Sequence, residues 1–537
     1  MAKYHELPPD AGRVITSLRD SGYDFNTAVA DIVDNSIAAS ASLIKIAVGI
    51  QPGHDDVAVA ISDNGAGMSM RGLKNALTYG SSVRSDEHSL GKFGLGLKTA
   101  STSQCRRLTV VSRKRGVESK LVLDIDHAET TGKWEYIEDD ISKLERRYLD
   151  QAGTPTHGTV VIWTNCDRLM GRSYKNPGTP AYKRALTRKV DRLRFHLSMV
   201  FQRFLDPADH RAPTVGIVLN GTPLKPYDPF AQKLGRTVTT FEGAKQFDLF
   251  ENESIVKAHA YVVPSRDELQ TDEEIFAVFP KDISPDTMQG FFIYRENRLI
   301  HWGDWCGIHK NEFHYRLCRI DISFDSKLDD RFSVDFQKSK ITLDPDISDW
   351  LKDTVIVQAR KLGDERYREG STKRIAEKAP ISHVRSNRSI SKIEKEDPEQ
   401  NIKVTDLGEN IRKISTTKGR SFVEVISSES KKRIKANIRP VESLPNNALW
   451  EAGLFMEEDR PRTYVAINTS HPFYQHAYYT CKGNTNAIRC LDYLIWSLAK
   501  AEYSTKDEES RENYQDMIIE VSRTLRMLAE DLPQDED

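Results

Sequence analysis

The 537-residue sequence has few cysteines, no long apolar run and no excess of charge of one sign. Its six cysteines lie far apart and form no Cys-x-x-Cys pair, which argues against a thiolate metal site and a disulfide framework. No run of about 18 apolar residues is present, as a membrane-spanning helix would need. Residues 1–6 do not resemble a signal peptide. We therefore expect reduced thiols in a cytoplasmic protein.

The balance of charge limits the partners that the whole molecule can attract. The net charge of −2 excludes a strongly basic protein that binds nucleic acid through its overall field. The chain is long enough for three or four domains, at roughly 100–200 residues each. We find no internal repeat, so repeat architectures are excluded as well.

The first informative stretch is Asp63-Asn64-Gly65-Ala66-Gly67-Met68. It follows the apolar run Val57–Ile61, which predicts a buried strand. An acidic residue at a strand end, followed by two glycines, lets the backbone approach a flat ligand closely. The same residues are also common in ordinary turns, so this stretch alone is consistent with both a ligand site and a simple turn.

Two further segments favour a ligand. In residues 26–41, apolar residues recur at helical spacing, and Asp31 and Asn35 share one helix face because they are four residues apart. A carboxylate and an amide placed in this way can hold a water and Mg²⁺. In residues 91–101, glycines precede helix-forming residues, so free backbone N–H groups would attract phosphate. Further on, residues 157–163 predict a strand that opens with Gly-Thr.

In this order, the four segments resemble the GHKL ATPases, which include DNA gyrase B, a heat-shock chaperone, histidine kinases, MutL and MORC. Within these motifs, the residue pairs Asn35-Ser36 and Lys98-Thr99 are most similar to those of MORC- and MutL-like proteins. The resemblance implies an α/β fold: a Bergerat-type α/β sandwich, a second α/β transducer-like domain and a mainly helical C-terminal region. About thirty residues precede the Asn35 segment, which disfavours a histidine kinase with its phosphoacceptor hairpin.

The resemblance implies an adenine site and a phosphate site. At the first, Asp63 would accept the adenine amino group, beside Gly65, Gly67, Met68 and Thr159. The expected cofactors are ATP and Mg²⁺. The residues implied at the phosphates and the metal are Asn35, which would ligate Mg²⁺, and Gly94, Leu95, Gly96 and Lys98.

Two residues are implied in hydrolysis. Asp31 stands where the family usually has a glutamate as general base, and its side chain is one methylene shorter. Asp34 is a weaker substitute, because it points elsewhere on the helix. Lys338, in a segment that looks like the second-domain motif of MutL, would reach the γ-phosphate. The alternative for Lys338 is an exposed loop lysine.

The expected domains are an ATP-binding domain (1–170), a transducer-like domain (171–362), a charged, partly disordered linker (363–440) and a C-terminal domain (441–537). The basic residues of the predicted helix 182–194 favour a solvent-exposed helix face over a surface that binds nucleic acid. Residues 365–440 hold 19 Lys and Arg against 11 Asp and Glu, a net charge of +8. This segment is the main sequence feature in favour of a nucleic-acid partner.

The C-terminal domain predicts two apolar helix faces. Ile488, Leu491, Ile495 and Leu498 line one helix, and Ile518, Val521, Leu525 and Leu528 line the other. Packing within the chain and dimerisation both explain these faces. His471 is expected to be structural, because no nucleophile is paired with it.

The sequence therefore predicts an ATP-driven conformational switch that closes as a homodimer on nucleotide. DNA or a DNA-processing protein is the expected partner, in genome maintenance or defence. The alternatives are a protein-remodelling chaperone and a nucleotide-binding scaffold with little hydrolysis.

Overall fold

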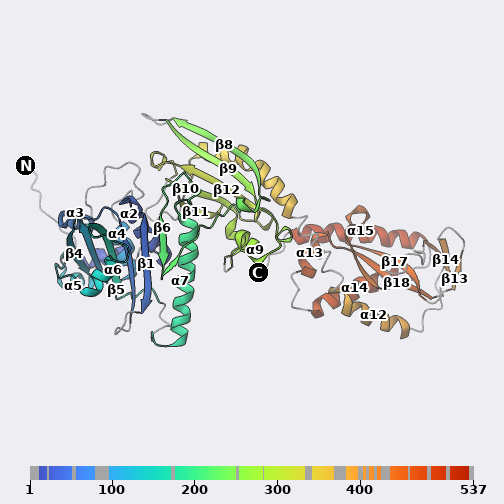
Figure 1. Ribbon diagram of the computed structural model, residues 1–537. Helices are drawn as coiled ribbons and strands as arrows, with labels where there is room; N and C mark the ends of the chain where they lie inside the picture. The colour runs from blue at the N-terminus through green and yellow to red at the C-terminus, as the bar shows by residue number, and fades with distance from the viewer. Residues whose placement is uncertain are drawn as a thin grey trace, which may run out of the picture. The chain divides into compact units, whose positions relative to one another are not determined.

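The protein is described by a computed structural model that divides into two compact units, Met1–Pro264 with Leu269–Glu365, and Ser265–Glu268 with Arg366–Asp537 (Figure 1). The described residues are 11–20, 23–50, 56–78, 96–170, 176–248, 253–281, 283–329, 331–332, 341–367, 382–396, 403–406, 411–415, 420–424, 436–457, 460–479, 485–503 and 508–530.

The first unit opens with a mixed sheet of order β4-β3-β5-β2-β1-β6-β7, in which the β1–β6 pair is parallel and the other pairs are antiparallel. Its strands are β1 (Leu43–Ile50), β2 (Val57–Asp63), β3 (Arg107–Lys114), β4 (Val117–Asp124), β5 (His157–Thr164), β6 (Gly216–Leu219) and β7 (Thr222–Pro223). The helices of this region are α1 (Ala11–Arg19), α2 (Phe25–Ala38), α3 (Met70–Leu77), α4 (Gly96–Gln104), α5 (Ile125–Thr131), α6 (Lys143–Leu149), α7 (Pro180–Val200) and α8 (Gln202–Leu205).

Strand β2 lies inside this sheet and is buried along its whole length, as its apolar run predicts. Helix α2 begins after Asp24, whose side chain accepts hydrogen bonds from the backbone N–H groups of Asn26 and Thr27. The apolar residues of α2 join the core beneath the sheet, which fixes the rotation of this helix. The side of α2 that carries Asp31 and Asn35 is thereby set relative to the end of β2.

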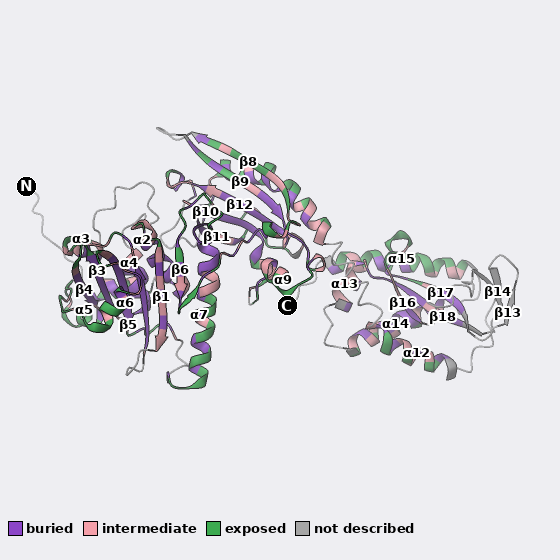
Figure 2. Cartoon of the chain, viewed as in Figure 1, coloured by how far each residue is buried: buried purple, intermediate pink, exposed green. Residues whose placement is uncertain are grey.

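Residues beyond 170 complete the first core. Helix α7 buries Leu186, Val190, Leu193 and Leu197 in the core of the first sheet, and β6 pairs with β1. The basic residues Lys183, Arg184 and Arg188 lie on the exposed side of α7, which Figure 2 shows as a helix with one buried and one exposed side. The predicted domain boundaries themselves remain a prediction.

The second sheet of this unit has the order β11-β10-β12-β9-β8. Its elements are β8 (Val238–Asp248), β9 (Glu253–Val262), α9 (Asp272–Val278), β10 (Gly290–Arg295), β11 (Arg298–Asp304), β12 (Cys318–Phe324) and α10 (Pro345–Trp350). The sequence did not predict β8 or β11. Strands β10 and β11 are joined through Glu296 and Asn297, whose φ angles of 47° and 67° suit a tight hairpin turn.

In its described residues, the second unit has two three-stranded sheets, of order β13-β14-β15 and β16-β18-β17. Its elements are α12 (Val384–Glu396), β13 (Lys403–Asp406), β14 (Ile411–Ser415), β15 (Arg420–Glu424), β16 (Ile438–Val441), β17 (Trp450–Glu457), β18 (Arg460–Asn468), α13 (Pro472–Tyr479), α14 (Thr485–Glu502) and α15 (Glu508–Glu530). The predicted linker 363–440 therefore contains regular elements in its described part, and Ile390 of α12 belongs to the C-terminal core.

The predicted apolar face of α14 packs inside the chain, since Ile488 and Ile495 are buried in the C-terminal core and Leu491 and Leu498 pack against it, whereas the face of α15 is only partly internal. Ile518 is buried and Leu525 packs against the core, whereas Val521 is 36% and Leu528 57% exposed. His471 is buried at the start of α13, where its Nδ1 accepts from the Phe473 N–H, in line with the structural role expected for it. Among the described residues, every helix is too short or too polar to cross a lipid bilayer.

Overall, the mixed α/β fold predicted from the sequence is confirmed, with helices dominating the end of the chain.

Candidate functional site

The centre of the candidate site is the carboxylate of Asp63 at the end of β2, where the residue is 6% exposed. Its Oδ1 accepts from the Gly65 N–H at 2.9 Å, and its Oδ2 accepts from the Ser36 hydroxyl at 2.9 Å. Burial raises the pKa of Asp63, while hydrogen bonds from Gly65, Ser36 and the Thr159 backbone act in the opposite direction. The site thus holds a buried acceptor in a fixed orientation.

The two glycines after Asp63 are required by the backbone. A Cβ on Gly67, whose φ is +63°, would lie 2.0 Å from the carbonyl oxygen of Arg113 on β3. A Cβ on Gly65 would lie 2.8 Å from the carbonyl oxygen of Ala39. The turn therefore presses against both neighbouring elements, and a side chain at either position would displace it from Asp63.

Strand pairing brings Thr159 to this turn, since Asp63 and Thr159 are register partners in the β2–β5 pair. Ser112 of β3 links the two sides: its hydroxyl lies 2.9 Å from the Thr159 hydroxyl and accepts from the Met68 N–H at 2.7 Å. The sequence alone did not predict Ser112, and it pointed to Ser36 only as a neighbour of Asn35 in the family resemblance, without a role in the site. The residues predicted to surround adenine do come together, joined by these two serines.

The predicted phosphate side is formed by α2 and the start of α4. Asn35 is half-buried, and its Nδ2 donates to the Asp31 carbonyl at 2.9 Å. The Asp31 side chain is buried, and its Oδ2 accepts from the Tyr23 hydroxyl at 3.0 Å. A Cβ on Gly96 would lie 3.8 Å from that same Oδ2, which places the start of α4 beside Asp31.

Lys98 lies in the first turn of this helix and is fully buried. Its Nζ donates to the carbonyl oxygen of Thr78 at 2.6 Å, and burial lowers its pKa to about 8. Lys98 therefore joins the beginning of α4 to the end of α3. Gly94, Leu95 and Lys338, which were also predicted at the site, lie outside the described residues.

A charged residue of the second sheet also reaches α2. The Nε of Arg298 lies 3.0 Å from Asp34 Oδ2, and its Nη2 lies 3.6 Å from Asp31 Oδ1. Asp34 is buried and lies against the same guanidinium group as Asp31, so it does not point away from Asp31 as expected from the sequence. No local pattern in the sequence singled out Arg298, because 264 positions separate it from Asp34.

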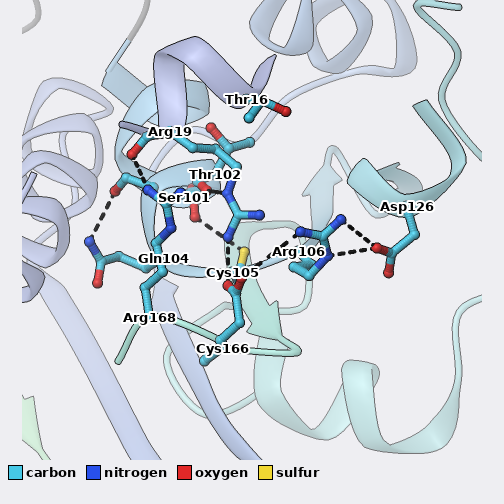
Figure 3. A network of polar contacts seen from close by, with 12 residues as sticks. Thr16, Arg19, Ser101, Thr102, Gln104, Cys105, Arg106, Asp126, Cys166 and Arg168 are labelled. Atoms are coloured by element: carbon cyan, nitrogen blue, oxygen red, sulfur yellow. Dashed lines mark hydrogen bonds and ion pairs between the residues drawn. The ribbon is translucent and has the colours of Figure 1, made fainter. Parts of the chain in front are cut away.

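The far end of α4 is braced by a second polar network (Figure 3). Arg19 of α1 donates to the Thr102 carbonyl at 2.8 Å and pairs with Asp167 at 2.5 Å. Cys105 and Cys166 lie buried in this network as free thiols, and burial raises the pKa of both. These thiols are protonated at neutral pH and unsuited to thiolate chemistry, as is typical of structural cysteines.

Part of the first unit is similar in sequence to a known protein family. Residues 23–159 match the family described as histidine kinase-, DNA gyrase B-, and HSP90-like ATPase. The fold and the site thus define an N-terminal ATPase domain of the GHKL type, a class of ATP-binding domains. The matched stretch runs from Tyr23 to Thr159 and includes Asp31, Asn35 and Asp63. No curated protein matches the chain.

Proposed function

We propose that this protein is an ATP-hydrolysing conformational switch whose GHKL domains close as a homodimer on nucleotide. The observation that carries the proposal is the buried Asp63 carboxylate, held by Ser36 and Gly65 beside Thr159. A fixed acceptor at a strand end, flanked by close-packed backbone, suits the amino edge and flat face of adenine. The site residues therefore fit ATP.

Helix α2 supplies groups for both ends of such a ligand. Ser36 supports the adenine end, and Asn35 offers its Oδ1 to a metal ion, since its Nδ2 is used within the helix. Bound ATP with Mg²⁺ would supply the γ-phosphoryl group that a water molecule attacks. Asp31 is our candidate for the base that takes the proton from that water.

The work done by the switch is proposed to be on DNA or on a DNA-processing partner, in genome maintenance or defence, as in the MORC- and MutL-like proteins that the motifs resemble. The charge of the segment 365–440, with its net +8, supports a nucleic-acid partner. We further propose that closure brings Lys338 toward the γ-phosphate and that the protein acts in the cytoplasm. The exposed Val521 and Leu528 on α15 are candidates for a contact between two chains.

One observation favours a second candidate, a nucleotide-binding scaffold with little hydrolysis. The carboxylate of Asp31 already accepts from Tyr23 and lies near Arg298, so it is less free to receive a proton from water. Measured turnover separates the two candidates, because both bind ATP.

The test is a titration of ATP turnover and of oligomeric state, each with and without duplex DNA and at two salt concentrations. The proposal expects slow turnover, a nucleotide-dependent dimer and DNA binding that weakens as salt rises. ATP binding without turnover would support the scaffold. Dimerisation and turnover without DNA binding would overturn the DNA assignment and favour the chaperone alternative, which client-binding assays then address.

A further inference from the structure

Arg298 is the first residue of β11, directly after the tight turn Glu296–Asn297. This turn fixes where the β10–β11 hairpin ends, and therefore where the Arg298 side chain begins. The residue is 4% exposed, although it belongs to the edge strand of the second sheet. An arginine buried to this degree requires negatively charged or hydrogen-bonding partners.

The partners of Arg298 lie on α2, the helix that shares a hydrophobic core with the first sheet. The Nε of Arg298 lies 3.1 Å from Asp34 Oδ1 and 3.0 Å from Asp34 Oδ2. The Nη2 extends on to Asp31 Oδ1 at 3.6 Å. One guanidinium group therefore lies against two carboxylates three positions apart on one helix, and the separate nitrogens of its planar fork suit this better than the single nitrogen of a lysine ammonium.

The other side of Asp31 is held as well. The Tyr23 hydroxyl donates to Oδ2, while Arg298 approaches Oδ1, so the carboxylate is contacted from two directions. His196 of α7 faces the same cluster, and burial lowers its pKa to about 4, with the charge of Arg298 acting in the same direction. His196 is thus neutral at neutral pH and leaves the two aspartates to balance Arg298.

We propose that Arg298 is a positioning residue for ATP hydrolysis, which orients the Asp31 carboxylate and ties α2 to the second sheet. The inference rests on the proposed function, in which Asp31 is the base. A base must lie within hydrogen-bonding reach of the attacking water, and the hydrogen bond from Tyr23 together with the ion-pair contact of Arg298 keeps the Asp31 carboxylate in one orientation, although the same contacts make it a weaker base. Because the holding arginine belongs to the second sheet, a shift of that sheet changes the orientation of Asp31.

The principal test is Arg298→Gln, with turnover normalised to the number of ATP-binding sites. We expect kcat to fall about 10-fold or more while ATP affinity stays within about 3-fold, because Arg298 touches neither Asp63 nor Asn35. Arg298→Lys keeps the charge without the two-point geometry, and should recover only part of kcat.

Arg295→Gln provides a matched control from the same hairpin. Arg295 pairs with Asp329 at 2.6 Å, and both side chains are 5% exposed, so this variant also loses a buried ion pair. The partner lies on the segment after β12, outside α2. We expect a lower unfolding temperature for Arg295→Gln, with kcat per binding site within about 2-fold of wild type.

Hydrogen exchange of the nucleotide-free protein supplies a readout that does not depend on turnover. The amides of residues 28–37 should exchange faster in Arg298→Gln and unchanged in Arg295→Gln. Equal effects of the two variants on kcat and on exchange would overturn the inference, and so would wild-type kcat in Arg298→Gln. If the wild-type protein has no turnover, the proposed function fails, while the exchange experiment still decides whether Arg298 holds α2.

Discussion

At the scale of single residues, Asp63 connects the fold most directly to a ligand. Both of its oxygens already accept hydrogen bonds, from Gly65 and from Ser36, so its orientation does not depend on the ligand. The remaining acceptor capacity of the carboxylate is available to a donor such as an amino group. This arrangement explains why an acidic residue, and not an amide, stands at the end of β2.

We predict that Asp63→Asn abolishes ATP binding. Asparagine keeps the shape but replaces one acceptor oxygen by an NH₂ group, which would face the donors of Gly65 or Ser36. Calorimetry with ATP measures the loss, and circular dichroism checks that the variant is folded. Near-normal affinity in a folded variant would show that Asp63 does not contact the adenine.

For Asp31, we predict that the alanine variant binds ATP normally but turns over about 10²-fold more slowly or worse, the usual scale for a lost general base. Asp31→Asn is the control for shape, since it retains an oxygen for Tyr23 but cannot accept the proton. Asp31→Glu should retain or increase turnover. If Asp31→Ala works at the wild-type rate, the base lies elsewhere, and Asp34 is the next candidate.

Lys98 gives a prediction about pH. Its lowered pKa of about 8 means that the buried side chain is charged below this pH and neutral above it. If Lys98 attracts phosphate, ATP binding takes up a proton above pH 8, so affinity should fall by up to about 10-fold per pH unit there. Calorimetry at pH 7, 8 and 9 tests this, and Lys98→Gln should remove the pH dependence. A similar slope in both proteins would assign the titration to another group.

At the scale of elements, the turn after β2 is held by its contact with β3. The carbonyl of Arg113 lies where a side chain at position 67 would begin, and Met68 donates to Ser112 on the same strand. The turn and β3 therefore move as one piece, together with Thr159 through its contact with Ser112. The adenine part of the site depends on three strands packing closely at one edge.

We predict that Gly67→Ala lowers ATP affinity by at least about 10-fold, because the turn must shift to relieve a 2.0 Å contact and a strained φ angle. Gly49→Ala is a matched control, since a Cβ there meets nothing within 4 Å. Fluorescence titration with an ATP analogue compares the two variants. Equal, near-wild-type affinities would mean that the turn adapts without disturbing Asp63.

Helix α2 serves several partners at once. It contributes Ser36 to Asp63, Asn35 and Asp31 to the predicted phosphate side, and Asp34 to Arg298 of the second sheet. These side chains leave the helix in different directions, because successive residues are rotated by about 100°. A single rigid element therefore connects both parts of the ligand site with the second sheet.

At the scale of the whole molecule, we predict that a non-hydrolysable ATP analogue with Mg²⁺ shifts the protein toward a closed dimer. Residues 78–96 are polar and Gly-rich in sequence, and the prediction is that they bind the phosphates, so that the nucleotide favours one state over the other. Light scattering and limited proteolysis without nucleotide, with ADP and with the analogue measure the shift. Asp63→Asn should show none.

Identical mass, shape and cleavage in all three states would contradict the switch and leave the scaffold as the better interpretation. A dimer that is already present without nucleotide would instead point to a permanent contact, for which the exposed apolar residues of α15 are the first place to look. Substituting Leu528 by Glu would separate these two cases, because it changes an exposed position without removing a core residue.

The sequence by itself determined the local parts of this protein. Helical periodicity placed Asp31 and Asn35 on one side of α2, and the apolar run of β2 placed Asp63 at a strand end. The Gly-Thr pair predicted the opening of β5, and the structure pairs Thr159 with Asp63. These features are readable because neighbouring residues fix them through the helix period and the burial of a strand.

Tertiary structure alone decided the long-range parts. The pairing of β6 with β1 joins residues more than 170 positions apart, and Arg298 reaches Asp34 across 264 positions. Ser112 enters the site only because β3 packs beside the Gly67 turn. No local pattern encodes such contacts, since they follow from how whole sheets and helices pack around shared cores, and small polar side chains become partners only where that packing brings them together.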